Sequence, residues 1–209
     1  FPELLVWHFN QIKDFASALT HAKALDLRLQ EQGERLMELG HTAHANRDEA
    51  TALACYRYVA AKGKDNPYFF TARNEVLQVQ FDQLTSEVPV DLDAASDLAE
   101  AYAEGLRDLG VRPETAMMVK DRAHLLAFYL NRADEAIEAL EALLARNDLN
   151  ERVAAACKLT LGDIYVFNDL IWDASLVFSQ VNLDFKDDPL GHEAKFRNAR
   201  VSYFGGDFN

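Results

Sequence analysis

Residues 158–189 of the chain are KLTLGDIYVFNDLIWDASLVFSQVNLDFKDDP, and this stretch decides the fold that we expect. In its first half, the large Leu161 and the small Gly162 are followed by the aromatic Tyr165. In its second half, the small Ala174 is followed by the large Phe178. Two antiparallel helices can approach closely where Gly or Ala lies at their crossing, and an aromatic ring fills the wedge between them. The stretch therefore predicts a tight helix-turn-helix pair that ends near Pro189.

This order of residues resembles the tetratricopeptide repeat, a helix-turn-helix unit of about 34 residues. The spacing of the small residues elsewhere agrees, since Ala52 lies 34 residues after Ala18. The next intervals, through Ala95 and Ala136 to Ala174, are 43, 41 and 38 residues. A repeat of this length with short linker extensions therefore accounts for nearly the whole chain.

The resemblance implies an all-α fold, a right-handed solenoid of antiparallel helix pairs in one domain over residues 1–209. We expect five pairs and a half-pair, with approximate bounds 1–32, 33–67, 68–110, 111–149, 150–188 and 189–209. Within 68–110, the expected first helix at 68–85 lacks the Leu-Gly signature and is followed by a longer loop at 86–91, so the repeat type of this pair stays open.

Composition narrows the classes of partner. The 209 residues carry a formal net charge of −13, which opposes binding to nucleic acid or to anionic membranes. No apolar run is long enough to insert directly into a membrane. We expect a soluble protein, cytoplasmic or periplasmic, and composition does not choose between the two. The chain begins with Phe and shows no leader, so we expect a fragment of a longer protein.

The two cysteines, Cys55 and Cys157, each fall inside an expected helix. In a stack whose repeats touch only their neighbours, residues so far apart in the sequence do not meet. We therefore expect two buried free thiols rather than a disulfide.

In the family that the chain resembles, the first helix of each pair lines a concave surface that holds an extended peptide or a helix. The register of the repeats assigns these residues to that surface: Trp7, Met37, His41, His44, Arg122, Leu125, Phe128, Tyr129, Leu159, Asp163 and Phe167. The set is aromatic and mildly polar, and aromatic anchors are common in interfaces. It lacks the combination of Lys, Asn and Arg with which some members clamp a carboxyl terminus, because neither Met37/His41 nor Asp121/Leu125 supplies the required donors.

The sequence gives little support for a metal site or a catalytic site. His41 and His44 lie three residues apart on one expected helix face, but a structural zinc needs four ligands. We expect no metal. The pairs Glu138/Glu141 and Asp187/Asp188 fit a solvated helix face and a capping loop better than acid–base chemistry.

Gly205-Gly206-Asp207 matches no phosphate-binding motif, and no nucleophile motif is present. We expect no cofactor and no enzymatic activity within this segment.

The sequence thus favours a non-enzymatic scaffold that binds a peptide or helix of a partner protein. One alternative is a structural spacer or self-assembly element of a bacterial-type envelope- or secretion-associated protein. This alternative is suggested by four apolar residues in the incomplete last repeat: Phe196, Val201, Tyr203 and Phe204. A further alternative is the targeting arm of an enzyme whose catalytic domain lies outside this segment.

Overall fold

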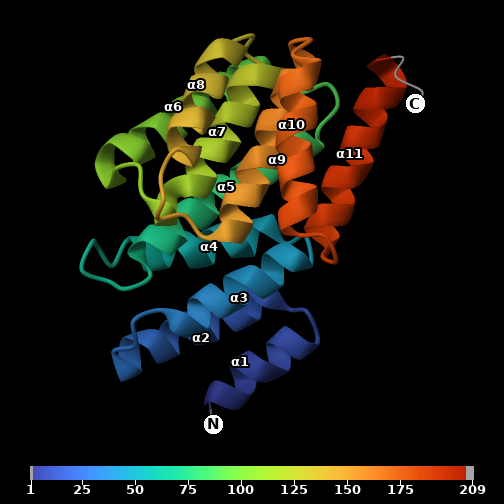
Figure 1. Cartoon of the computed structure of the whole chain (residues 1–209). Coiled ribbons are helices and arrows are strands. Elements are labelled where there is room, and N and C mark those ends of the chain that lie inside the picture. The colour runs from blue at the N-terminus through green and yellow to red at the C-terminus, as the bar shows by residue number, and fades with distance from the viewer. Residues whose placement is uncertain (1, 206–209) are drawn as a thin grey trace. The chain divides into compact units, whose positions relative to one another are not determined.

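The computed structural model describes residues 2–205, and within them the chain forms eleven α-helices, one 3-10 turn and no strand (Figure 1). The all-α expectation is confirmed. The segment Gly205-Gly206-Asp207 that we considered as a turn lies outside the described residues, apart from the backbone of Gly205.

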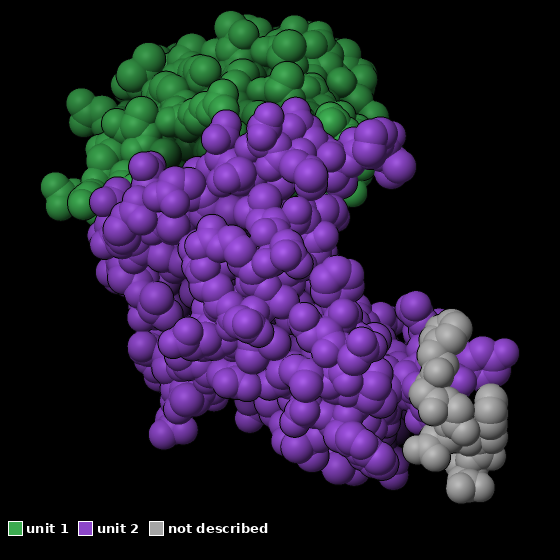
Figure 2. Space-filling view, turned by 90° about the horizontal axis from the view of Figure 1, so that it is seen from above, with its two compact units in different colours: residues 1–87 green, residues 88–209 purple. Residues whose placement is uncertain are grey.

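The chain divides into two compact units, Phe1–Glu87 and Val88–Asn209, coloured separately in Figure 2. We expected one repeat domain over residues 1–209. The expected pair at 68–110 is divided, because α5 (Phe69–Ser86) belongs to unit 1 and α6 (Leu92–Leu109) to unit 2. The division falls in the expected pair whose repeat type the sequence left open.

Unit 1 consists of two helix pairs followed by α5: α1 (Pro2–Gln11), α2 (Phe15–Leu29), α3 (Glu34–Ala45) and α4 (Glu49–Ala60). Consecutive helices pack on one another, and α2 also contacts α4. This is the contact pattern of stacked pairs, in which each element meets only near neighbours. Unit 1 has its own core, which includes the fully buried Leu36, Cys55 and Tyr56.

Unit 2 contains α6, a 3-10 turn (Pro113–Thr115), and five further helices: α7 (Ala116–Phe128), α8 (Ala133–Leu144), α9 (Glu151–Phe167), α10 (Ile171–Asp184) and α11 (Pro189–Gly205). Here α7 contacts both α8 and α9, and α9 contacts both α10 and α11 (Figure 1). The alternate helices α7, α9 and α11 therefore form a row of neighbours within this unit.

The same turn joins the two helices of four pairs. In each, a non-glycine residue with left-handed backbone lies two positions before the next helix: Lys13 (φ 60°), Arg47 (φ 63°), Asn131 (φ 53°) and Asp169 (φ 59°). The next residue is the N-cap. In unit 1 the caps are aspartates 34 residues apart, and Asp14 and Asp48 accept hydrogen bonds from the backbone N of Ser17 and Thr51.

The small residues that we expected at helix crossings are all buried. Ala18, Ala52, Ala136 and Ala174 have no exposed surface. Gly40 packs against Tyr56, just as Gly162 packs against Phe178. The close crossings that the sequence predicts are therefore present in both units.

None of the described helices combines the length and apolar character that a membrane span requires.

Candidate functional site: a surface on α7, α9 and α11

The row of alternate helices in unit 2 borders an open hollow of about 470 Å³, which we call the aromatic hollow. The last turn of α7 supplies His124 and Phe128, and Tyr129 follows directly. The His124 ring lies 4.6 Å from Phe128 and 5.8 Å from Tyr129, centroid to centroid. These three half-buried rings form one wall of the hollow.

Phe167, at the end of α9, extends this aromatic wall. Its ring meets that of Phe128 edge to face with centroids 5.3 Å apart, and 57% of its surface is exposed. Edge-to-face contacts of this kind hold aromatic rings in a defined geometry. The wall therefore presents ordered apolar surface to solvent.

The opposite side of the aromatic hollow is charged. Asp163 of α9 and Glu193, Arg197 and Arg200 of α11 line it. Arg197 donates hydrogen bonds to the carboxylates of Asp163 and Glu193 and from Nη1 to the backbone O of Leu159 at 3.4 Å. It ties α11 to α9.

Arg200 is placed differently. Its guanidinium lies 5.9 Å from the ring centroid of Phe196, and within residues 2–205 no carboxylate forms an ion pair with it. It is exposed. Arg200 therefore offers a cation to the hollow that the fold itself does not neutralise.

Burial changes the titration of two groups in the hollow. Burial, together with the smaller effect of the positive charge of Lys120, lowers the pKa of His124 to about 4. It also raises the pKa of Asp163, against the opposing influence of Arg197. His124 is therefore neutral near pH 7, so the positive charge of the hollow comes from α11 alone.

A second hollow, of about 360 Å³, adjoins the first, and we call it the aliphatic hollow. Its apolar lining comes from α9, α10 and α11: Val166, Ile171, Phe178 and Val201. Asp163, Arg197 and Arg200 line both hollows. These three side chains therefore lie where the two hollows meet.

Among the residues that we assigned to the groove, the structure brings Phe128, Tyr129 and Asp163 together in the aromatic hollow and places Phe167 at its edge. Met37, Leu125 and Leu159 are buried in the cores of their units, with at most 6% of their surface exposed. The assignment of these three to a binding surface is corrected, because side chains packed in a core offer no surface to a partner.

Arg122 also differs from the assignment. Its side chain pairs with Glu135 of α8, 2.6 Å from Nη2 to Oε1, and only 18% of it is exposed. Arg132 joins the same carboxylate. The register assigned Arg122 to the concave surface, but its side chain pairs with Glu135 of α8 and does not line the hollow.

The assigned residues of unit 1 lie on α1 and α3. Trp7 is exposed on α1. On α3, His41 and His44 face carboxylates of α5, with Nε2 3.7 Å from Glu75 and 3.3 Å from Asp82, respectively. The two histidines thus contact different carboxylates. Within the described part of the chain no three His, Cys, Asp or Glu side chains gather as a metal site would require.

The cysteines are buried free thiols, as expected, one in each unit. Burial raises the pKa of Cys55 to about 12 and that of Cys157 to about 11. Neither thiol is activated as a nucleophile.

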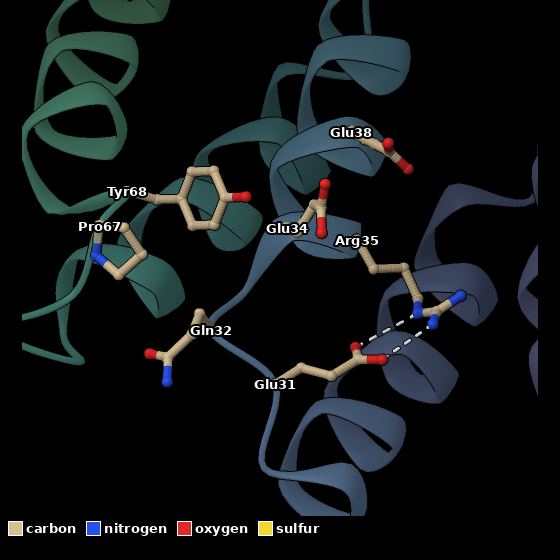
Figure 3. Close-up of a pocket in the computed structure, with 7 residues that line it drawn as sticks. All are labelled: Glu31, Gln32, Glu34, Arg35, Glu38, Pro67 and Tyr68. Atoms are coloured by element: carbon tan, nitrogen blue, oxygen red, sulfur yellow. Dashed lines mark hydrogen bonds and ion pairs between the residues drawn. The ribbon is translucent and has the colours of Figure 1, made fainter.

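Unit 1 carries a separate acidic hollow of about 410 Å³ beside the start of α3. Figure 3 shows Arg35 turned toward Glu31, to which it is hydrogen bonded, with Glu34 and Glu38 on the neighbouring turns. Tyr68 lies across from them. The cation of this hollow is thus already paired, unlike Arg200 in unit 2.

The sequence assignment missed His124, Glu193, Arg197 and Arg200. A signal for one of them was present, since Arg197 lies 34 residues after Asp163, one repeat length along the chain. Extending the register into residues 189–205 finds it. The positions of Glu193 and Arg200 depend on how α11 is rotated against α9, and that of His124 depends on the packing of α7.

Comparison with known proteins adds no constraint: no family model matches the sequence, and no curated protein is significantly similar to it.

Proposed function

We propose that the chain is a tetratricopeptide-like helical-repeat protein without enzymatic activity, and that unit 2 binds a peptide or helix of a partner protein across α7, α9 and α11. The observation that carries the proposal is the aromatic hollow. Ordered rings of Phe128, Tyr129 and Phe167 line a surface depression beside an unpaired arginine. Rigid aromatic anchors and arginine are the residues that most often dominate binding energy at protein interfaces.

The repeat architecture supports the proposal through three independent features. Alternate helices are neighbours, the same left-handed turn joins four helix pairs, and small residues lie at the crossings. In stacked pairs of this kind, the row of first helices forms an extended surface suited to a linear partner. The hollow lies on that row.

A selection with a phage-displayed random peptide library tests the proposal. We expect the intact protein to enrich peptides that no longer bind after Phe128→Ala with Phe167→Ala. The matched control removes two exposed apolar side chains of α10, Trp172→Ala with Leu176→Ala, which do not line either hollow. Equal binding by the hollow variant and the intact protein, with circular dichroism unchanged, overturns the proposal.

Self-assembly is the second candidate function, and the exposed apolar residues of α11 favour it. Phe196 and Tyr203 are 60% and 65% exposed. Val201, which we expected on the same face, is buried, and the side chain of Phe204 lies outside the described set. Light scattering of the protein and of Phe196→Ser with Tyr203→Ser tests this candidate. Self-association that the double variant abolishes supports it, and a monomer at high concentration excludes it.

A further inference from the structure

We infer that the surface on α7, α9 and α11 recognises a linear segment in which an acidic side chain stands between two large apolar ones. The inference rests on the proposed function and names the chemistry of its partner. It follows from the position of Arg200 between the aromatic and the aliphatic hollow.

The acidic element follows from the charge available at this position. Arg197 is hydrogen bonded to Asp163, Glu193 and a backbone carbonyl, whereas Arg200 lies beside the ring of Phe196 and forms no ion pair within residues 2–205. The charge of Arg200 acts to lower the pKa of Asp163, which lines the same hollows. A guanidinium binds a carboxylate in a paired geometry, with hydrogen bonds stronger than neutral ones. The carboxylate of an Asp or Glu is therefore the group that completes the coordination of Arg200.

The local charge also favours a single acid over an acidic tract. Helix α11 carries Lys195, Arg197 and Arg200 against one acid, Glu193, in a chain whose net charge is −13. At physiological ionic strength charges interact over about 8 Å, so a carboxylate at Arg200 senses the cations of α11 together with Asp163 and Asp169, two acids that line the same hollow. A run of acids extending beyond α11 meets a repelling surface.

The two apolar elements follow from the hollows on either side. The aromatic hollow offers the rings of Phe128 and Tyr129, and the aliphatic hollow offers Val166 and Ile171. Each has room for a large side chain, at about 470 and 360 Å³. Because the hollows share the arginines, a segment that fills both brings its central residue to Arg200.

Fluorescence competition with synthetic peptide pools tests the inference. The main pool is Phe-Xaa-Glu-Xaa-Leu flanked by randomised residues, with acetylated and amidated ends so that the only fixed carboxylate is a side chain. Two reference pools replace Glu by Gln, or Phe and Leu by Ala. We expect the intact protein to bind the Glu pool roughly tenfold more tightly than the Gln pool. The Ala pool is expected to lose most binding.

The variants Arg200→Gln and Lys195→Gln make the test specific. Both remove one positive charge from α11, but Lys195 lies on the opposite side of the helix from Arg197 and outside both hollows. The preference for Glu over Gln is expected to vanish in Arg200→Gln and to persist in Lys195→Gln. In the intact protein, the ratio of affinities for the Glu and Gln pools should also decrease as the salt concentration is raised.

The outcomes separate the inference from the proposed function. Equal binding of the Glu and Gln pools, or a preference that survives Arg200→Gln, overturns the inference. If binding of the pools is then still lost when Phe128 and Phe167 are replaced by Ala, the proposed function is supported and only the inference fails. If no pool binds better to the intact protein than to the variant lacking those two rings, both fail.

Discussion

The ring of Phe178 occupies the space that a side chain at Gly162 would take. A Cβ placed on Gly162 would come within 2.4 Å of Cε1 of Phe178, closer than real carbon contacts allow. Phe178 itself is fully buried. The approach of α9 and α10 thus depends on a missing side chain on one helix and an aromatic ring on the other.

Gly162→Ala should destabilise unit 2. The added methyl clashes with a ring that cannot move, and this overpacking outweighs the better helix propensity of Ala, for a net loss of about 1–2 kcal/mol. Urea denaturation monitored by circular dichroism measures the loss. Combining the change with Phe178→Leu should show a favourable coupling, because the smaller side chain relieves the clash. Additive effects would contradict this account of the crossing.

Loss of Lys62 should destabilise unit 1. Its Nζ lies 2.5 Å from Oδ2 of Asp26, which is 1% exposed and also accepts a hydrogen bond from Tyr58 at 2.9 Å. Lys62→Met strands a buried carboxylate, at a cost of about 3 kcal/mol. Adding Asp26→Asn removes the stranded charge but keeps an acceptor for Tyr58, so the double variant should recover part of the stability in urea denaturation. A double variant less stable than Lys62→Met alone would show that the charge is not the cause.

The left-handed turns predict a stabilising change. Arg47 holds φ at 63°, where a side chain is strained and glycine is not. Arg47→Gly is expected to raise the free energy of unfolding by up to about 1 kcal/mol, and Arg47→Ala is expected to give no gain. Asn131→Gly should gain less, since Asn tolerates this conformation best among the four. Thermal denaturation ranks the variants, and equal effects of Gly and Ala at 47 would count against turn strain.

Acidification should destabilise unit 2 through His124. Its folded pKa of about 4 lies below the ordinary value near 6.5. Between these values the unfolded chain binds a proton that the folded unit does not, so stability falls as pH drops from about 6.5 to about 4. The raised pKa of Asp163 acts in the opposite direction. In urea denaturation at pH 7 and pH 5, His124→Gln should lose less stability than the intact protein. An identical loss in both would exclude His124 as the source.

The sequence alone determined the local architecture of this protein. Small residues at a spacing near 34 and a Leu-Gly-Tyr order specify helix pairs, and the buried Ala18, Ala52, Ala136 and Ala174 confirm them. Packing of adjacent helices depends on which side chains fit at a crossing, and this information is local. The aromatic residues Phe128, Tyr129 and Phe167 were likewise found from register alone.

Only the tertiary structure decided which of the expected surface residues reach solvent. Met37, Leu125 and Leu159 share the helices of the predicted groove but turn into the cores, and Arg122 turns to Glu135. A shift of one residue rotates a side chain by about 100° around a helix, which is enough to move it from surface to core. The tertiary structure also decided the division into two units and the position of Arg200 between two hollows. Both depend on contacts between helices of different repeats, which the residues of a single repeat do not predict.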